Sequence, residues 1–203
     1  MLSKANFNIK GFLKIYDPIT NEVFVDKNNA IHYENMSEAI ALSLGNKSSS
    51  FISEMWFGNG GTTVDTTGVI TYSPTNTNVQ NADLYSPQYY KVVDDTSSAN
   101  TDPLRNKITI THTPGQIYSD IVISCLLDYS EPSGQAVFDN SQDLSGQFVF
   151  DELGLRGWSN AGPGQGKLLT HVIFSPVQKS LNRLIQIDYT VRIQTLTTLS
   201  SNA

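Results

Sequence analysis

The clearest hydrophobic pattern lies near the end of the chain, where apolar and polar residues alternate over residues 185–194. In an extended chain every second side chain points to the same face. One face here carries only apolar residues, namely Ile185, Ile187, Tyr189, Val191 and Ile193. The pattern predicts a half-buried β-strand, so we expect the end of the chain to belong to the core sheet.

Other segments also favour strands. Residues 7–16 and 22–27 flank a turn at 17–21 and predict a β-hairpin. Further short apolar runs bounded by turn residues predict strands at 51–57, 89–93, 107–113, 119–129, 147–155 and 168–174. Many short strands with little helix between them favour a mainly β fold, an antiparallel β-sandwich of jelly-roll-like form.

One short segment has a helical pattern instead. Asn35 to Glu38 has the form of a capping box, with Asn35 as N-cap and Glu38 reaching back to it. Apolar residues then recur every four positions from Met36, and Gly45 or Asn46 can end the helix. We therefore predict one short helix whose apolar face, formed by Met36, Ile40 and Leu44, lies on a sheet.

Residues 62–88 form a long polar stretch with few apolar residues. Compact domains rarely contain loops of this length without a functional reason. We treat residues 1–203 as a single β-sandwich domain in which residues 62–88 form an extended arm or loop. Because so few apolar side chains can hold this segment on its own domain, we expect it to contact a neighbouring subunit.

The composition narrows the classes of partner. Charged residues make up only 16% of the chain, below the roughly 25% of ordinary soluble domains, whereas Ser, Thr and Asn make up 57 of the 203 residues. Such a surface costs little to desolvate, which suits a protein packed among neighbours and also suits an extracellular β-protein. The net charge of −6 and pI near 4.9 argue against a nucleic-acid partner.

Cys125 is the single cysteine and lies in an apolar run, so it predicts a buried thiol and no intramolecular disulfide. The first residues lack the apolar region of a signal peptide, and no stretch reaches about 18 apolar residues. We therefore expect no membrane partner and a protein made in a cytoplasm.

Candidate catalytic motifs are weak. Gly162–Lys167 superficially resembles a phosphate-binding loop, but Ala161 and Leu168 stand where that pattern needs Gly and Ser or Thr, so a hairpin loop is favoured. His32, His112 and His171 are far apart and have no second His or Cys at metal-ligand spacing. We predict no metal, no cofactor and no catalytic residue. The alternative that the fold brings distant residues together as a catalytic triad stays open.

Asp151 and Glu152 are the most notable acidic pair because they lie inside an apolar strand. Glycosidases use paired carboxylates across a cleft, but neighbours on one strand point to opposite faces. We expect one of them to cap a loop or pair with Lys179, Arg183 or Arg192, and the other to face solvent.

Four large aromatic residues admit two interpretations. A sugar-stacking platform could be formed by Trp56, Trp158, Tyr89 and Tyr90. Such side chains are more often core or interface anchors, which is the interpretation we favour.

Two parts of the chain, residues 27–62 and 148–196, resemble tailed-bacteriophage virion structural proteins. The motifs that carry the resemblance are Asn29-Ala30-Ile31, the short helix after it, the turn Phe57-Gly58-Asn59-Gly60-Gly61, the strand Asp151-Glu152-Leu153-Gly154-Leu155, and the terminal strand after Phe174-Ser175-Pro176-Val177-Gln178-Lys179. We expect Gly58, Gly60 and Gly61 to adopt positive φ at a sharp corner, and Gly154 to let the acidic pair approach a neighbouring loop. Together with Asp151, Glu152, Lys179 and Arg183, these glycines are the structural or interface candidates.

The resemblance implies a non-enzymatic virion protein that assembles into a symmetric ring or lattice, with the neck, collar or tail-attachment region as its expected place. Its partners would be copies of itself and other virion proteins such as portal, connector, tail or capsid proteins. It would be found in the virion and assembled in the host cytoplasm. A capsid decoration protein and a carbohydrate-binding virion module are the alternatives, and a glycan hydrolase ranks third.

Overall fold

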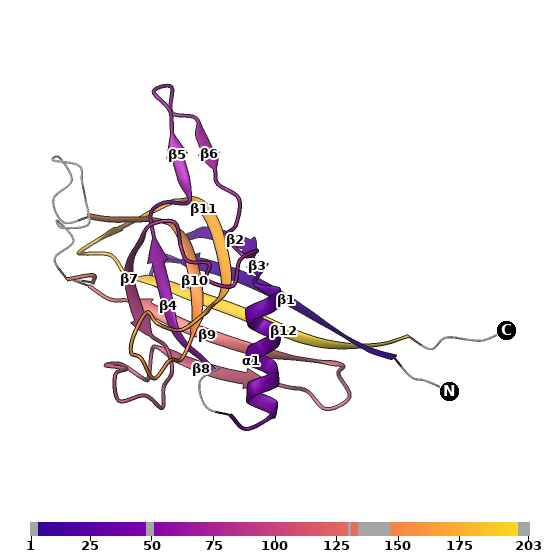
Figure 1. Ribbon diagram of the computed structural model, residues 1–203. Helices are drawn as coiled ribbons and strands as arrows, with labels where there is room; N and C mark the ends of the chain where they lie inside the picture. Colours follow the sequence, from indigo (N-terminus) through magenta and orange to yellow (C-terminus); the bar gives the residue numbers. More distant parts are fainter. Residues whose placement is uncertain (1–3, 48–50, 130, 134–146, 199–203) are drawn as a thin grey trace.

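Two five-stranded antiparallel sheets pack face to face to form a β-sandwich (Figure 1). The computed structural model describes residues 4–47, 51–129, 131–133 and 147–198. Sheet I has the strand order β2 (Val23–Asn28), β1 (Lys4–Tyr16), β12 (Ile185–Thr198), β9 (Tyr118–Leu127) and β8 (Lys107–Thr111). Sheet II has the order β3 (Ala30–Ile31), β11 (Leu168–Ser180), β10 (Gln147–Gly157), β4 (Ile52–Gly58) and β7 (Pro87–Val92). The predicted mainly β antiparallel sandwich is confirmed.

The predicted terminal strand is the central strand of sheet I. β12 pairs with β1 along its whole length, from Lys4↔Thr198 to Tyr16↔Gln186, and with β9 on its other side. Ile185, Ile187, Tyr189 and Val191 are fully buried, as the pattern predicts, whereas Ile193 is only partly buried.

The core lies between the two sheets and is rich in aromatic rings. Phe150 makes edge-to-face contacts with Phe57 and Phe174, with ring centroids 5.3 and 5.8 Å apart. Cys125 is buried in the same core, and burial raises the pKa of its thiol to about 12. The predicted role of Cys125 as a small buried apolar residue is confirmed.

The single helix of the described residues is α1 (Tyr33–Leu44), and its N-cap differs from the prediction. The cap is His32, whose Nδ1 accepts a hydrogen bond from the backbone N–H of Asn35 at 3.2 Å. The prediction that Asn35 caps the helix is therefore wrong by three residues. Ser, Thr, Asp and Asn are the usual caps, but an imidazole nitrogen can accept the same bond.

The C-terminal end of α1 follows the prediction only in part. The helix stops at Gly45, as expected. Met36 is buried and Ile40 packs partly against the core, but Leu44 is largely exposed. The last turn of the helix therefore reaches beyond the sheet that it covers. Among the described residues, no helix combines the length and the apolar character needed to cross a membrane.

Two β-ribbons project from the sandwich (Figure 1). The first is the small hairpin of β5 (Thr62–Val64) and β6 (Ile70–Tyr72), which forms a separate two-stranded sheet. The second is formed by the outer ends of β1 and β12, which run side by side past α1 and away from the body. Residues 73–86, between β6 and β7, lie against β10 and β11 of sheet II.

Candidate functional site

Both residues of the acidic pair face the turn after β4. The pairing of β10 with β11 shifts register between Phe150 and Glu152, and such irregularities re-aim side chains that a regular strand would send to opposite faces. Asp151 and Glu152 are both buried, so the expectation that one of them faces solvent is wrong. Each carboxylate accepts hydrogen bonds from the backbone of residues 60–62.

Asp151 holds the start of the β5–β6 hairpin. Its Oδ1 accepts the backbone N–H of Gly61 at 2.9 Å, and its Oδ2 accepts the backbone N–H of Thr62 at 2.8 Å. The Thr62 hydroxyl donates to the same Oδ2. These three charge-assisted bonds fix the direction in which the hairpin leaves the body.

Glu152 is fully buried and has four donors. Its Oε1 accepts the backbone N–H groups of Gly60 and Ser86, at 3.1 and 2.8 Å. Its Oε2 accepts the backbone N–H of Tyr85 at 2.9 Å and the ring nitrogen Nε2 of His171 at 3.0 Å. Burial raises the pKa of the Glu152 carboxyl, but the bonds from His171, Ser86, Tyr85 and Gly60 outweigh burial and hold the pKa below its usual value.

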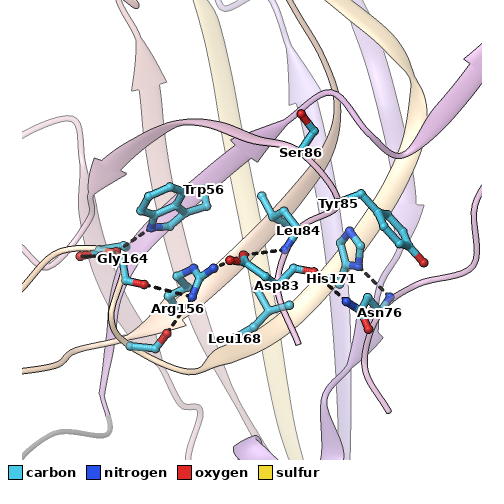
Figure 2. A network of polar contacts seen from close by, with 12 residues as sticks. Trp56, Asn76, Asp83, Leu84, Tyr85, Ser86, Arg156, Gly164, Leu168 and His171 are labelled. Carbon is cyan, nitrogen blue, oxygen red and sulfur yellow. Dashed lines mark hydrogen bonds and ion pairs between the residues drawn. The ribbon is translucent and has the colours of Figure 1, made fainter. Parts of the chain in front are cut away.

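The contacts of His171 assign its tautomer. Its Nδ1 accepts the backbone N–H of Asn76 at 2.8 Å, so Nδ1 carries no proton and Nε2 donates to Glu152. The ring of Tyr85 covers the imidazole with centroids 5.7 Å apart (Figure 2). His171 therefore links Asn76, near the start of the 73–86 segment, to Glu152, whose carboxylate binds Tyr85 and Ser86 at the end of that segment.

A second set of contacts fixes the middle of this segment (Figure 2). The Asn76 amide Nδ2 donates to the Asp83 carbonyl at 3.0 Å, and the Asp83 carboxylate makes an ion pair with the guanidinium of Arg156. Arg156 is buried, also donates to the Gly166 carbonyl at 2.9 Å, and lies over the ring of Trp56 at 5.2 Å. The Arg156 side chain thus links the segment to the loop that follows β10.

The helix end of the body supplies two more contacts. His32 Nε2 lies 2.7 Å from the Val79 carbonyl oxygen, and Asn35 Nδ2 donates to the carbonyls of Gln80 and Leu168 at 3.2 and 2.8 Å. Both side chains are almost fully buried. Residues 74–86 are therefore held on their own domain by buried polar groups, which corrects the expectation that this part of 62–88 needs a neighbouring subunit to hold it.

The predicted basic partners of the acidic pair lie elsewhere. Lys179 is buried and its Nζ donates to the Ser180 carbonyl at 2.8 Å. Arg183 pairs with Asp17 and Glu22 at the β1–β2 turn. Arg192 forms a two-pronged pair with Asp120 on the neighbouring strand, at 2.7 Å for both bonds. Of the two predicted roles, pairing of Asp151 or Glu152 with these residues is wrong, and capping of a loop is confirmed, because both carboxylates accept backbone N–H groups of residues 60–62.

The glycines of the turn are required by close approach and not by positive φ. None of Gly58, Gly60 and Gly61 lies in the left-handed region. A Cβ on Gly58 would overlap the Glu152 carboxylate, and one on Gly60 would lie 2.7 Å from the Tyr85 Cβ. A Cβ on Gly61 would lie 2.9 Å from the Asp151 carbonyl oxygen. The predicted positive φ is wrong: Gly58 and Gly61 leave steric room for the acidic pair, and Gly60 leaves room for Tyr85 and Ser86.

Gly154 provides room of the same kind further along β10. A Cβ there would lie 2.6 Å from Leu168 Cδ1 and 3.1 Å from Leu84 Cδ2. Leu84 is a buried apolar residue of the 73–86 segment. Gly154 thus lets that segment approach the sheet, close to the expectation from the sequence.

The four notable aromatic residues do not form one platform. Trp56 stacks on Tyr90 with centroids 4.8 Å apart, and its Nε1 donates to Glu54 at 2.6 Å. Trp158 stacks on Phe51 instead, and Tyr89 packs beside the core. A small cavity of about 210 Å³ lies beside Trp158 and is lined with polar groups that include Asn160 and Gln165.

The arrangement of Asp151, Glu152 and His171 is suited to fixing backbone. Neither Glu152 nor His171 is exposed to solvent, and every side-chain polar atom of the two has a protein partner. The described residues contain no group of three or more His, Cys, Asp or Glu side chains that could hold a metal ion. The sequence argument treated His171 only as an isolated histidine and did not single out Arg156, although each is a polar residue inside an otherwise apolar run, which is a signal of a buried and partnered side chain.

Comparison with known proteins gives no relatives: no family model, no curated protein and no solved structure matches this chain.

Proposed function

We propose that this chain is a non-enzymatic structural protein of a tailed-bacteriophage virion, and that it assembles with copies of itself into a symmetric ring or lattice. The neck, collar or tail-attachment region is the proposed place, with capsid decoration as the alternative. The observation that carries the proposal is the β5–β6 hairpin, which projects from the sandwich (Figure 1). Two of its valines, Val64 and Val69, are 59% and 57% exposed.

The hairpin holds its shape without help from a neighbour. At its tip, Asp65 Oδ1 accepts the backbone N–H groups of Thr67 and Val69 at 2.8 and 3.0 Å, and Gly68 adopts a φ of 85°. At its base, the Tyr72 hydroxyl lies 2.7 Å from the Ser175 hydroxyl of β11. A preorganised projection loses little conformational entropy when it binds, which favours its use as an intersubunit contact.

The two faces of the hairpin differ in chemistry. Val64 pairs with Ile70 and Thr62 pairs with Tyr72, so these four residues share one face. Thr63 and Thr71 pair on the opposite face. Thr62 and Tyr72, at the base of the first face, contact Asp151 and Ser175 of the body, so its outer part with Val64 would be buried against the neighbour, since burial of apolar area is the main favourable term in association.

Two neighbouring substitutions test the proposal. Val64→Asp places a charge on the apolar face, whereas Thr63→Asp places the same charge one residue away on the opposite face. Mass photometry and negative-stain electron microscopy should show rings or lattices for the wild type and for Thr63→Asp, and only small species for Val64→Asp. A wild type that stays small at every concentration tested would overturn the proposed assembly, and equal assembly of both variants would move the contact away from this hairpin.

A carbohydrate-binding virion module is the second candidate, and the cavity beside Trp158 favours it. An aromatic ring next to amide side chains is the usual chemistry of sugar recognition, and Asn160, Gln165 and Lys167 all line this cavity. A glycan array with the wild type and Trp158→Ala tests this function. Binding that disappears in Trp158→Ala would support it, and an array without signal for the wild type would reject it.

A further inference from the structure

The outer edge of β1 is unpaired over half of its length. β2 pairs with β1 only along Phe12–Tyr16, and the Gly11 carbonyl accepts the backbone N–H of Asn29 at 3.1 Å. Within the described residues, no strand pairs with this edge over Lys4–Lys10. The opposite edge of the same segment is fully paired with β12, so the segment is held as a strand without an outer neighbour.

The contact at Gly11 shows which groups of this edge are free. In an antiparallel strand the N–H and C=O of one residue point to the same edge, and alternate residues point to opposite edges. Because the Gly11 carbonyl points outward, the backbone groups of Ala5, Phe7 and Ile9 do so as well. Such a row of free donors and acceptors is a template for adding another strand.

We infer that the free edge of β1 binds the same edge of a second copy of this chain, in an antiparallel pair centred on Phe7. This inference rests on the proposed self-assembly and adds a second interface to it. The sequence Lys4-Ala5-Asn6-Phe7-Asn8-Ile9-Lys10 identifies the occupant, since it is nearly the same read in either direction. Antiparallel pairing with itself puts Phe7 opposite Phe7, Ala5 opposite Ile9, and Asn6 opposite Asn8.

Each of these cross-strand pairs is chemically matched. Phe7 is 65% exposed, and its pairing with a second Phe7 would cover apolar surface on the face that continues to the buried Leu13. Asn6 and Asn8 would face each other on the polar side. A two-fold pair of this kind is closed, because the same patch serves both partners.

The position of the ribbon leaves room for the second copy. The outer ends of β1 and β12 extend away from the body, so two antiparallel ribbons would place the two bodies at opposite ends (Figure 1). Lys4 of one copy would then lie beside Lys10 of the other, where a cavity of about 490 Å³ lies between the β1 edge and Tyr33. Tyr33 is 77% exposed and stands at the rim of that cavity.

In the same register Lys4 of each copy lies opposite Lys10 of the other copy, so this contact occurs twice in each dimer. Like charges directly opposite each other weaken a strand pair, whereas opposite charges strengthen it. Lys10→Glu should therefore tighten the association by about tenfold, since it replaces two repulsions with two attractions. The double variant Lys4→Glu with Lys10→Glu should return the association to near the wild-type level.

Analytical ultracentrifugation in the Val64→Asp background tests this interface apart from the hairpin contact. The background protein should be a dimer, and Phe7→Pro should make it a monomer, because proline removes an outward N–H that the fold of the protomer does not use. Circular dichroism melting of Phe7→Pro near that of the background protein confirms that the fold is kept. The charge variants are a control for misfolding, because a misfolded protein would not form a tighter dimer.

The outcomes separate the two proposals. A monomeric background protein beside a wild type that still forms rings or lattices would overturn the β1 pairing and leave the proposed assembly standing. A wild type that stops at a dimer sensitive to Phe7→Pro would support the β1 pairing and overturn the larger assembly. Lys10→Glu that weakens the dimer, or leaves it unchanged, would overturn the antiparallel register centred on Phe7.

Discussion

His171 Nε2 lies 3.0 Å from Glu152 Oε2 in the interior of the sandwich, and neither side chain is exposed to solvent. The two residues come from neighbouring strands, β10 and β11, and both bind backbone groups of the 73–86 segment. A His–Glu pair is often a sign of chemistry. Here the other acceptor positions of both side chains are taken up by backbone N–H groups, and the pair joins two strands to one loop.

Glu152→Gln should lower the free energy of unfolding at neutral pH by about 3 kcal/mol. Each carboxylate oxygen accepts two donors, so the amide NH₂ of glutamine must turn toward two N–H groups whichever way it is oriented. Urea unfolding measures the effect. Glu22→Gln is the matched control, because Glu22 is exposed and its pair with Arg183 should contribute less than about 1 kcal/mol.

The effect of Glu152→Gln should depend on pH. The pKa of Glu152 in the folded protein lies below its ordinary value of 4.5, so the unfolded chain binds the proton more readily. The stability that the carboxylate contributes is therefore complete above about pH 5 and is lost as the pH falls through its folded pKa. Unfolding free energies of wild type and variant should converge in acid, and a difference that stays constant down to about pH 3 would contradict this role.

Amide hydrogen exchange should divide residues 62–86 into two parts. The N–H groups of Asn76, Tyr85 and Ser86 bind buried side chains and should exchange slowly, whereas that of Thr66, at the hairpin tip, should exchange fast. His171→Leu removes the acceptor of Asn76 and should speed exchange at that position without speeding it in β12. Uniformly fast exchange over the whole segment in the wild type would show that the buried contacts do not hold it.

Ile187→Asp should unfold the protein or come close to doing so. Ile187 is fully buried in the central strand of sheet I, and an unpaired charge there costs several kcal/mol, of the order of the ~5–15 kcal/mol that stabilise a domain. Thr190→Asp puts the same group on the opposite, partly exposed face of β12 and should melt close to the wild type. Circular dichroism melting compares the two variants.

Because of Lys179, the free energy of unfolding should rise with pH in mildly alkaline solution. Burial lowers the pKa of Lys179 to about 8, although the carboxylates of Glu131 and Asp128 act in the opposite direction. In the unfolded chain the lysine titrates near 10.5, so between these values the unfolded state binds more protons and the wild type gains stability as the pH rises.

Urea unfolding of wild type and Lys179→Met in steps from about pH 7 to 9.5 isolates this contribution. The free energy of unfolding of the wild type should rise relative to that of Lys179→Met over this range. Cys125 acts in the other direction, because burial raises the pKa of its thiol, but it is present in both proteins and cancels. Parallel pH profiles would mean that Lys179 keeps its ordinary pKa in the folded state.

The strands could be predicted because their signal is local. The alternation from Ile185 to Val191 needs only the neighbouring residues to be read, and the structure buries every one of those apolar side chains. The partners of Asp151 and Glu152 could not be predicted in the same way. They are backbone groups about 90 and 66 residues away, and the sequence does not indicate which backbone N–H groups will bind a given side chain.

The error over residues 62–88 has a physical cause as well. Counting apolar residues identifies segments held by the hydrophobic effect, and this segment has few of them. Its attachment relies on Glu152, His171, Arg156, His32 and Asn35, which lie outside it and are themselves buried. Only the hairpin formed by β5 and β6 projects as the sequence led us to expect.

The way in which residues 73–86 are fastened has a consequence for sequence variation. The body contacts many main-chain atoms of this segment, the N–H groups of Asn76, Tyr85 and Ser86 and the carbonyls of Val79 and Gln80, and only a few of its side chains, such as those of Asp83 and Leu84. The path of this loop is therefore determined mainly by residues of the strands and of the helix cap that bind it. Exposed loop side chains such as those of Asn78 and Gln80 can therefore vary during evolution, or be exchanged by design, while the loop keeps its path.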